Sequence, residues 1–243
     1  MTKVRRVRVA RSDGSGGRAV QSYEVPEGAR MTVLDGLLHI HRYCDRGLAF
    51  RYACRAGMCG TCSVTVNGVG RLACSTRLSA IPDEVVVVEP LRHFPVIRDL
   101  VVDFAPFFDA WRAVHPSFIP ASTLADEARV QPESRERRLI DRHRECISCG
   151  ICYAACDVVG MHPGFLGPAA MTRALCLLAD SRGAGHEERL AVLDSARGCW
   201  RCHTHGTCAD LCPKGLDPTR AIEKVKRILA ARAMRRLVGL RPG

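Results

Sequence analysis

The stretch RYACRAGMCGTC, residues 51–62, decides the fold of the first part of the chain. It separates three cysteines by four and then two residues, and a fourth cysteine follows after eleven more. This spacing is typical of a plant-type [2Fe–2S] cluster, whereas a zinc site prefers two even Cys-x2-Cys pairs. Gly57 and Gly60 permit the backbone angles and close approach by which loop N–H groups can point at the cluster sulfurs. We therefore predict a [2Fe–2S] cluster on Cys54, Cys59, Cys62 and Cys74.

The residues around this loop predict a small mixed sheet crossed by one helix. Short apolar segments predict strands, and Asn67-Gly68 is a typical hairpin turn. An apolar stripe at helical spacing predicts the helix over residues 33–41, and Thr32 with Asp35 gives a weak capping-box signal at its start. The strands are expected near residues 7–9, 22–25, 63–66, 71–73 and 85–88, the last of them buried on both faces.

Prolines at positions 90, 95 and 106 separate this part from a second one, so we place a domain boundary near residues 104–106. The remainder has apolar stripes at helical spacing over residues 169–182, 186–195 and 219–237, and no convincing alternating strand. We therefore predict an α+β chain, with a β-rich domain in residues 1–105 and an all-α domain in residues 106–243.

Two further cysteine groups lie in the predicted helical part. Residues 146–156 read C-x2-C-x2-C-x3-C, the bacterial ferredoxin run, whose fourth cysteine ligates the other cluster. Residues 202–212 fit the same run, except that His205 stands where its second cysteine is expected. The cross-ligation rule then assigns a [4Fe–4S] cluster to Cys146, Cys149, Cys152 and Cys212.

The other three cysteines of these two groups are Cys156, Cys202 and Cys208. They supply three ligands and suit a [3Fe–4S] cluster, since the second group lacks a cysteine for the fourth corner. His205 offers an alternative, because imidazole ligates iron in Rieske centres, and a [4Fe–4S] cluster with one histidine would result. The other interpretation, a polar residue near the sulfurs, also stays open. Cys176 lies on an apolar stripe and is expected to be a buried thiol.

The composition excludes several other classes of protein. The chain has 243 residues, 14 cysteines and a formal net charge of +11. It has no apolar stretch long enough to span a membrane, and residues 1–10 lack the apolar region of a cleaved secretory signal. Clustered thiols then indicate metal ligands rather than disulfides. The charge is densest in residues 135–144 and 224–241, but no nucleic-acid-binding module is recognisable, so we expect no nucleic-acid partner.

The order of these motifs resembles the iron–sulfur subunit of succinate dehydrogenase and fumarate reductase. The resemblance covers nearly the whole chain and extends beyond the cysteines to GFLGPAA at residues 164–170 and CPKGLDPTR at residues 212–220. It implies a β-grasp ferredoxin domain followed by an α-helical ferredoxin domain. One departure is Asp157, which stands where the ferredoxin run usually has proline.

The resemblance also implies that the chain transfers electrons and has no catalytic residues of its own. A flavoprotein partner would oxidise succinate at its FAD, and a quinone bound against a separate membrane-anchor subunit would accept the electrons. The implied path runs from the [2Fe–2S] cluster on Cys54, Cys59, Cys62 and Cys74, through the [4Fe–4S] cluster on Cys146, Cys149, Cys152 and Cys212, to the [3Fe–4S] cluster on Cys156, Cys202 and Cys208.

The sequence departs from the family at the quinone site. The family's tryptophan is missing from residues 157–162, which leaves the quinone type and the anchor undetermined. His203 matches a family histidine and is the first candidate for the site, with Trp200 as a candidate wall and His162 as a further candidate. A structural role for each of the three is the competing interpretation.

Two alternative functions remain beside the main one. The same relay can serve a different FAD-dependent organic-acid dehydrogenase, and a zinc-stapled basic binding module is the remote alternative. The family implies a peripheral position at the cytoplasmic face of the inner membrane, without a transmembrane segment in this chain. There the basic residues near the C-terminus would attract anionic headgroups, although a solvated helix face explains them equally well.

Overall fold

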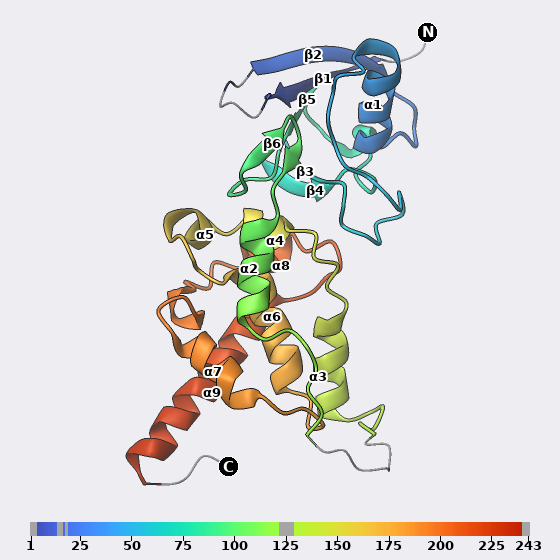
Figure 1. Ribbon diagram of the computed structural model, residues 1–243. Helices are drawn as coiled ribbons and strands as arrows, with labels where there is room; N and C mark the ends of the chain where they lie inside the picture. The colour runs from blue at the N-terminus through green and yellow to red at the C-terminus, as the bar shows by residue number, and fades with distance from the viewer. Residues whose placement is uncertain (1–3, 14–16, 18, 122–128, 240–243) are drawn as a thin grey trace. The chain divides into compact units, whose positions relative to one another are not determined.

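The computed structural model describes residues 4–13, 17, 19–121 and 129–239 (Figure 1). The chain forms two compact units, of which unit 1 comprises Met1–Phe104 with Ile147–Ala155, and unit 2 comprises Ala105–Cys146 with Cys156–Gly243. The chain first leaves unit 1 at Phe104, beside the expected boundary, but the segment Ile147–Ala155 packs with the β-rich unit. The domain limits 1–105 and 106–243 stay a prediction.

Unit 1 is built on a five-stranded mixed sheet in the order β2-β1-β5-β3-β4. β1 pairs in parallel with β5, and the other neighbouring strands are antiparallel. Because arginine and valine alternate along β1, Val7 and Val9 point into the core and are 2% and 0% exposed. The strands are β1 (Val4–Arg11), β2 (Ala19–Pro26), β3 (Ser63–Val66), β4 (Val69–Leu72) and β5 (Val85–Glu89).

Helix α1 (Val33–His39) begins with the predicted capping box. The Asp35 N–H donates to Thr32 Oγ1 at 3.2 Å, and the Thr32 N–H donates to Asp35 Oδ2 at 3.0 Å. The helix buries its apolar stripe and continues as a π-helical turn, Ile40–Cys44. A mixed sheet with one main helix is the predicted β-grasp arrangement, which is confirmed.

The strand β4 differs from its prediction. It begins at Val69, directly after the Asn67-Gly68 turn, rather than at residue 71. Asn67 and Gly68 have φ angles of 46° and 79°, which two-residue hairpin turns require, and Val66 therefore pairs with Val69. A tight turn leaves no residues between the turn and the return strand.

The burial of β5 also differs from its prediction. Val86 and Val88 are fully buried, but Val85 and Val87 are only partly buried, so the strand is covered on one face rather than two. The proline-rich stretch that follows contains a short strand pair, β6 (Val96–Arg98) and β7 (Val101–Val102), which the sequence did not predict.

Unit 2 is helical, as predicted, and α6 (Gly167–Leu178) is its central element. Ten of its twelve residues are buried, and it packs against α2, α3, α7 and α9. It begins before the expected residue 169 because Pro168 is well suited to the first turn of a helix. No helix in the described part of the chain has the length and apolar character of a membrane span. The other helices are α2 (Ala105–Ala113), α3 (Arg135–Arg144), α5 (Asp157–Met161), α7 (His186–Asp194), α8 (Thr207–Asp210) and α9 (Pro218–Leu237), while α4 (Ile151–Ala154) belongs to unit 1.

The buried guanidinium of Arg189 holds the segment that follows α2 against α7. It is 1% exposed and donates to the carbonyl oxygens of His115, Ser117 and Ala184 at 3.1, 2.7 and 2.6 Å. Burial lowers the pKa of Arg189, and the three carbonyls compensate in part for the lost water. This arginine therefore connects α7 to the end of α2 through backbone acceptors.

We expect the substitution Arg189→Leu to destabilise the protein by about 3 kcal/mol or more, because three carbonyl groups lose their donor. Arg197→Leu is the control, since exposed Arg197 donates to a single carbonyl, that of Gly164, and should change stability by about 0.5 kcal/mol or less. Urea unfolding of the full-length chain, followed by far-UV circular dichroism, measures both. Equal effects of the two substitutions would contradict the structural role of Arg189.

Candidate metal centres

The loop that precedes β3 directs peptide N–H groups at one sulfur. The N–H groups of Ala56, Met58 and Cys59 lie 3.4, 3.3 and 3.3 Å from Cys54 Sγ. Such donors offset the negative charge of a thiolate cluster. The prediction that this loop aims its backbone at the sulfurs is confirmed for Cys54.

The hairpin of β3 and β4 brings the second half of this cysteine set together. Cys62 lies just before β3 and Cys74 just after β4, and the Cys74 N–H is 3.5 Å from Cys62 Sγ. Burial raises the pKa of the Cys62 thiol to about 12, whereas the Thr61 hydroxyl lowers the pKa of Cys59 to about 6. The four thiols thus range from buried Cys62 to exposed Cys54.

Gly57 and Gly60 both have positive φ angles, 70° and 73°. A Cβ atom on Gly57 would lie 2.9 Å from Ser75 Oγ. On Gly60 it would lie 2.8 Å from Cys149 Cα and 2.9 Å from the Ile147 carbonyl oxygen. At Gly57 a side chain would require Ser75 to shift, whereas at Gly60 it would meet backbone, because there the loop packs directly on the Ile147–Ala155 segment of the same unit.

We expect Gly60→Ala to reduce [2Fe–2S] incorporation strongly, because the new methyl group must displace backbone on which the cysteine loop rests. Gly68→Ala is a matched control: Gly68 also has a positive φ, 79°, but an added Cβ meets nothing within 4 Å. It should cost about 1 kcal/mol of backbone strain and retain the cluster. Iron and sulfide content with visible absorption measures both variants. A Gly60→Ala protein with full cluster content would refute this account of the loop.

The three cysteines Cys156, Cys202 and Cys208 lie together in unit 2. Burial is the main reason that the pKa of the Cys208 thiol is raised to about 11, and the negative charges of Cys156 and Cys202 also raise it. The Thr219 hydroxyl lies 3.3 Å from Cys208 Sγ, and the Thr204 N–H lies 3.4 Å from Cys202 Sγ. Burial also raises the pKa of Cys156, while the N–H groups of α5 oppose this shift. The set combines partly buried cysteines with nearby donors, which suits a cluster site.

The remaining predicted set is divided between the units, with Cys149 and Cys152 in unit 1 and Cys146 and Cys212 in unit 2. Within unit 1, Cys149 is buried and is followed by Gly150, whose φ is 76°. A Cβ on Gly150 would lie 2.9 Å from the Phe104 ring, so this turn also requires glycine. The assignment of these four cysteines to one cluster stays a prediction.

The residues singled out for a quinone site lie on or beside the turn Cys199–Arg201 of unit 2. The Trp200 indole is half exposed and donates to Asp194 Oδ1 at 2.7 Å. His162 Nδ1 lies 3.1 Å from a guanidinium nitrogen of Arg201. His203 is exposed, and its ring centre is 5.9 Å from that of His205. For His205, the role of an iron ligand and that of a polar residue near the sulfurs both stay predictions.

Sequence reasoning missed Lys226, which lies on α9. Its ammonium donates to the carbonyl oxygen of Cys202 at 2.7 Å and so places a positive charge beside a predicted cluster ligand. In the sequence it is one of several cations on an amphipathic helix, and nothing distinguishes it from the others. Cys176, in contrast, is buried as predicted.

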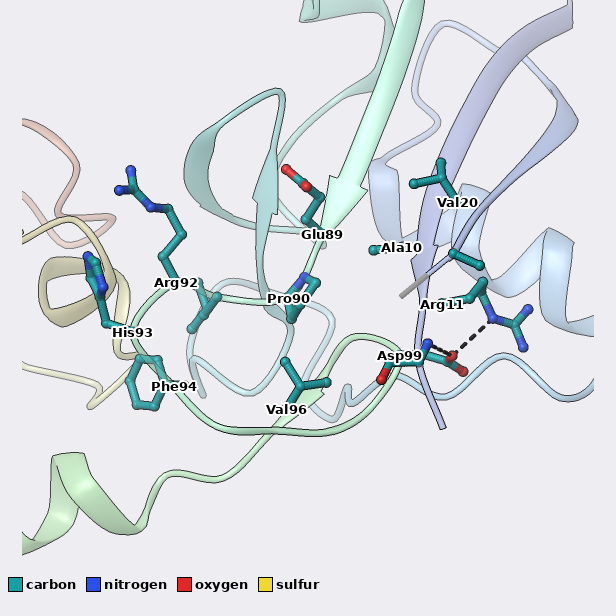
Figure 2. Close-up of a pocket in the computed structure, with 13 residues that line it drawn as sticks. Ala10, Arg11, Val20, Glu89, Pro90, Arg92, His93, Phe94, Val96 and Asp99 are labelled. Atoms are coloured by element: carbon teal, nitrogen blue, oxygen red, sulfur yellow. Dashed lines mark hydrogen bonds and ion pairs between the residues drawn. The ribbon is translucent and has the colours of Figure 1, made fainter. Parts of the chain in front are cut away.

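A separate cavity of about 540 Å³ lies in unit 1 between β1, β2 and the segment that follows β5 (Figure 2). Its polar wall is Asp99, which accepts hydrogen bonds from Arg11 Nε at 3.0 Å, the Ser12 N–H at 2.9 Å and the Ala49 N–H at 2.8 Å. These bonds join the end of β1 to two distant loops. None of the predicted site residues lines this cavity.

Two family models match the chain in the regions of these sites. Residues 3–109 match a 2Fe-2S iron-sulfur cluster binding domain, and residues 142–216 match a 4Fe-4S dicluster domain. The donors around Cys54 and around Cys156, Cys202 and Cys208 fit such groups. The chain is therefore an iron–sulfur protein in which a ferredoxin-type domain precedes a dicluster domain.

Individual relatives narrow this class. A fumarate reductase iron-sulfur subunit of Mycobacterium tuberculosis is 42% identical over 90% of this chain and 89% of its own, and one of Escherichia coli O6:H1 is 41% identical over 84% and 83%. A chain in the structure of the Mycobacterium smegmatis Sdh1 complex in the apo form matches with a TM-score of 0.88 and 33% identity, covering 96% of this chain and 98% of that one. The chain belongs to the iron–sulfur subunit family of fumarate reductase and succinate dehydrogenase, and is a component of an oxidoreductase complex.

Proposed function

We propose that the chain relays electrons between the FAD of a flavoprotein subunit and a membrane quinone. When bound, the clusters supply one-electron carriers, ordered from [2Fe–2S] through [4Fe–4S] to [3Fe–4S]. The observation that supports this most is the pair of sulfur-directed N–H arrangements, one at Cys54 in unit 1 and one at Cys202 in unit 2. Each unit supplies backbone donors for a separate centre.

The ligand sets in this proposal follow the cysteine spacing. The [2Fe–2S] cluster takes Cys54, Cys59, Cys62 and Cys74, the [4Fe–4S] cluster takes Cys146, Cys149, Cys152 and Cys212, and the [3Fe–4S] cluster takes Cys156, Cys202 and Cys208. The reaction at carbon belongs to the flavoprotein, so this chain holds and tunes the carriers.

Residues around the third set would place the quinone. Trp200, fixed by Asp194, would form a wall, and His162, held by Arg201, would lie at its edge. His203 would exchange a proton with the quinone as the electrons arrive, because an imidazole ring can both donate and accept a proton. The partners are then a flavoprotein subunit and a membrane-anchor subunit, with this chain peripheral at the cytoplasmic face of the inner membrane.

We expect low-temperature EPR of the oxidised complex to show a [3Fe–4S] signal, and succinate to bleach it. Succinate gives electrons to the flavoprotein, and these must reach the last carrier if the relay is correct. A signal that succinate leaves unchanged would mean that a different FAD-dependent dehydrogenase is the partner. The absence of the signal in a sample with full iron content would instead favour His205 as a fourth iron ligand.

The charge on Lys226 provides a second test. Lys226→Met removes a cation beside Cys202 and should lower the reduction potential of the third cluster, because the reduced cluster carries more negative charge. The expected shift is on the order of 50 mV, or about 1 kcal/mol for one electron. Arg235→Met removes one charge from the exposed end of α9 and is the control. A redox titration followed by EPR measures both, and equal shifts would rule out a local effect of Lys226.

A further inference from the structure

The two basic segments of the sequence meet in unit 2 around one groove. Helix α6 packs against both α3 and α9 and lies between them (Figure 1). The three helices line a groove of about 620 Å³, within the range of sites that take small ligands. Residues 135, 138, 139 and 142 of α3 and residues 224, 227 and 228 of α9 line it, and each set follows one helix face.

Carboxylates of the described residues balance only part of the positive charge of this groove, and Arg227 pairs with Glu223 at 3.8 Å. Among the described residues, Glu136 is the one acidic residue that lines the groove, and Glu136 Oε1 already accepts hydrogen bonds from the Ser181 N–H and hydroxyl, both at 2.8 Å. Across the described residues, no carboxylate pairs with Arg135, Arg142 or Lys224. The cations of the groove are Arg135, Arg138, Arg142, Lys224 and Arg227.

These cations repel one another. Burial lowers the pKa of Lys224, and the charges of Arg142 and Arg135 lower it further. A bound anion would relieve this repulsion, and guanidinium groups donate in pairs to phosphate oxygens. The charges therefore fit a phosphate-bearing ligand.

An apolar strip runs beside the cations. Leu139 and Ala179 are partly buried, and Ile228 is 39% exposed. An inorganic anion would leave this strip in water, and an acidic peptide would place polar backbone against it. A molecule with both a phosphate and a hydrocarbon chain matches both surfaces.

We propose that this groove binds one anionic phospholipid. Arg135, Arg142 and Lys224 hold its phosphate, and an acyl chain lies along Leu139, Ala179 and Ile228. The site would give unit 2 a specific lipid contact, in addition to the general attraction of a basic surface for anionic membranes.

The test is calorimetric titration of the full-length chain, with its clusters, using dioctanoyl phosphatidylglycerol below its micelle concentration. Dioctanoyl phosphatidylcholine and glycerol 3-phosphate are the reference ligands. Arg142→Gln combined with Lys224→Gln should weaken binding about tenfold or more. Arg235→Gln combined with Arg236→Gln removes the same charge from the exposed end of α9 and should leave the affinity unchanged. Ile228→Asn should weaken binding of the lipid but not of glycerol 3-phosphate.

Thermal unfolding shows whether the Arg142→Gln/Lys224→Gln protein is folded. Its melting temperature should be no lower than that of the parent, because the substitutions remove repulsion between cations. Equal affinity for glycerol 3-phosphate would reduce the groove to an anion site and overturn the lipid assignment. An equal loss of lipid affinity in the two double variants would mean that binding depends only on the net charge of the protein, and would overturn the proposal. Tighter binding of an oligoglutamate peptide than of phosphatidylglycerol would identify an acidic protein partner instead.

Discussion

The rest of unit 1 depends on one requirement, that peptide N–H groups point at the thiolate sulfurs. Cysteine thiolates gathered on one cluster repel one another, and donors must replace the water that each has lost. Three such donors surround Cys54 Sγ, and Gly57 and Gly60 supply the backbone angles that allow the loop to turn around it. The β3–β4 hairpin holds the other end of the set, because the Ala73 N–H donates to the Cys62 carbonyl at 3.0 Å. The sheet therefore serves as a frame for two ligands and the loop for the other two.

Unit 2 meets the same constraint by other means. Cys156 lies just before α5, Cys202 just after the turn Cys199–Arg201, and Cys208 within α8. Burial raises the pKa of Cys156 and Cys208. The Thr219 hydroxyl, the Thr204 N–H and the ammonium of Lys226 lie around this set. Solvent exposure, hydrogen bonds and nearby charge are the properties by which a protein adjusts cluster potentials. The two units differ in all three, so their centres are placed in distinct electrostatic surroundings.

The sequence predicted the elements that local chemistry specifies. The Asn67-Gly68 turn, the Thr32–Asp35 cap and the glycines of the cysteine loop all follow from backbone preferences within a few residues. It failed where distant packing decides the outcome. The partial exposure of Val85 and Val87 depends on what covers the second sheet face. The packing of Ile147–Ala155 with unit 1 likewise involves residues distant in sequence, among them Gly60, while the domain limits stay a prediction. The sequence does not predict β6 and β7, because nearby prolines indicate a break between domains rather than strands.

The cations show this most clearly, because basic side chains serve three different purposes in unit 2. Arg189 is buried and satisfies three carbonyl groups, Lys226 reaches the carbonyl of a cluster cysteine, and Lys224 faces a groove of like charges. In the sequence all three are basic residues within predicted helices. Lys224 and Lys226 are two positions apart on α9, so they point to different sides of the helix, and one serves the cluster while the other serves the groove. The basic residues behind the net charge of +11 therefore have different local roles, and only the packing of the helices distinguishes them.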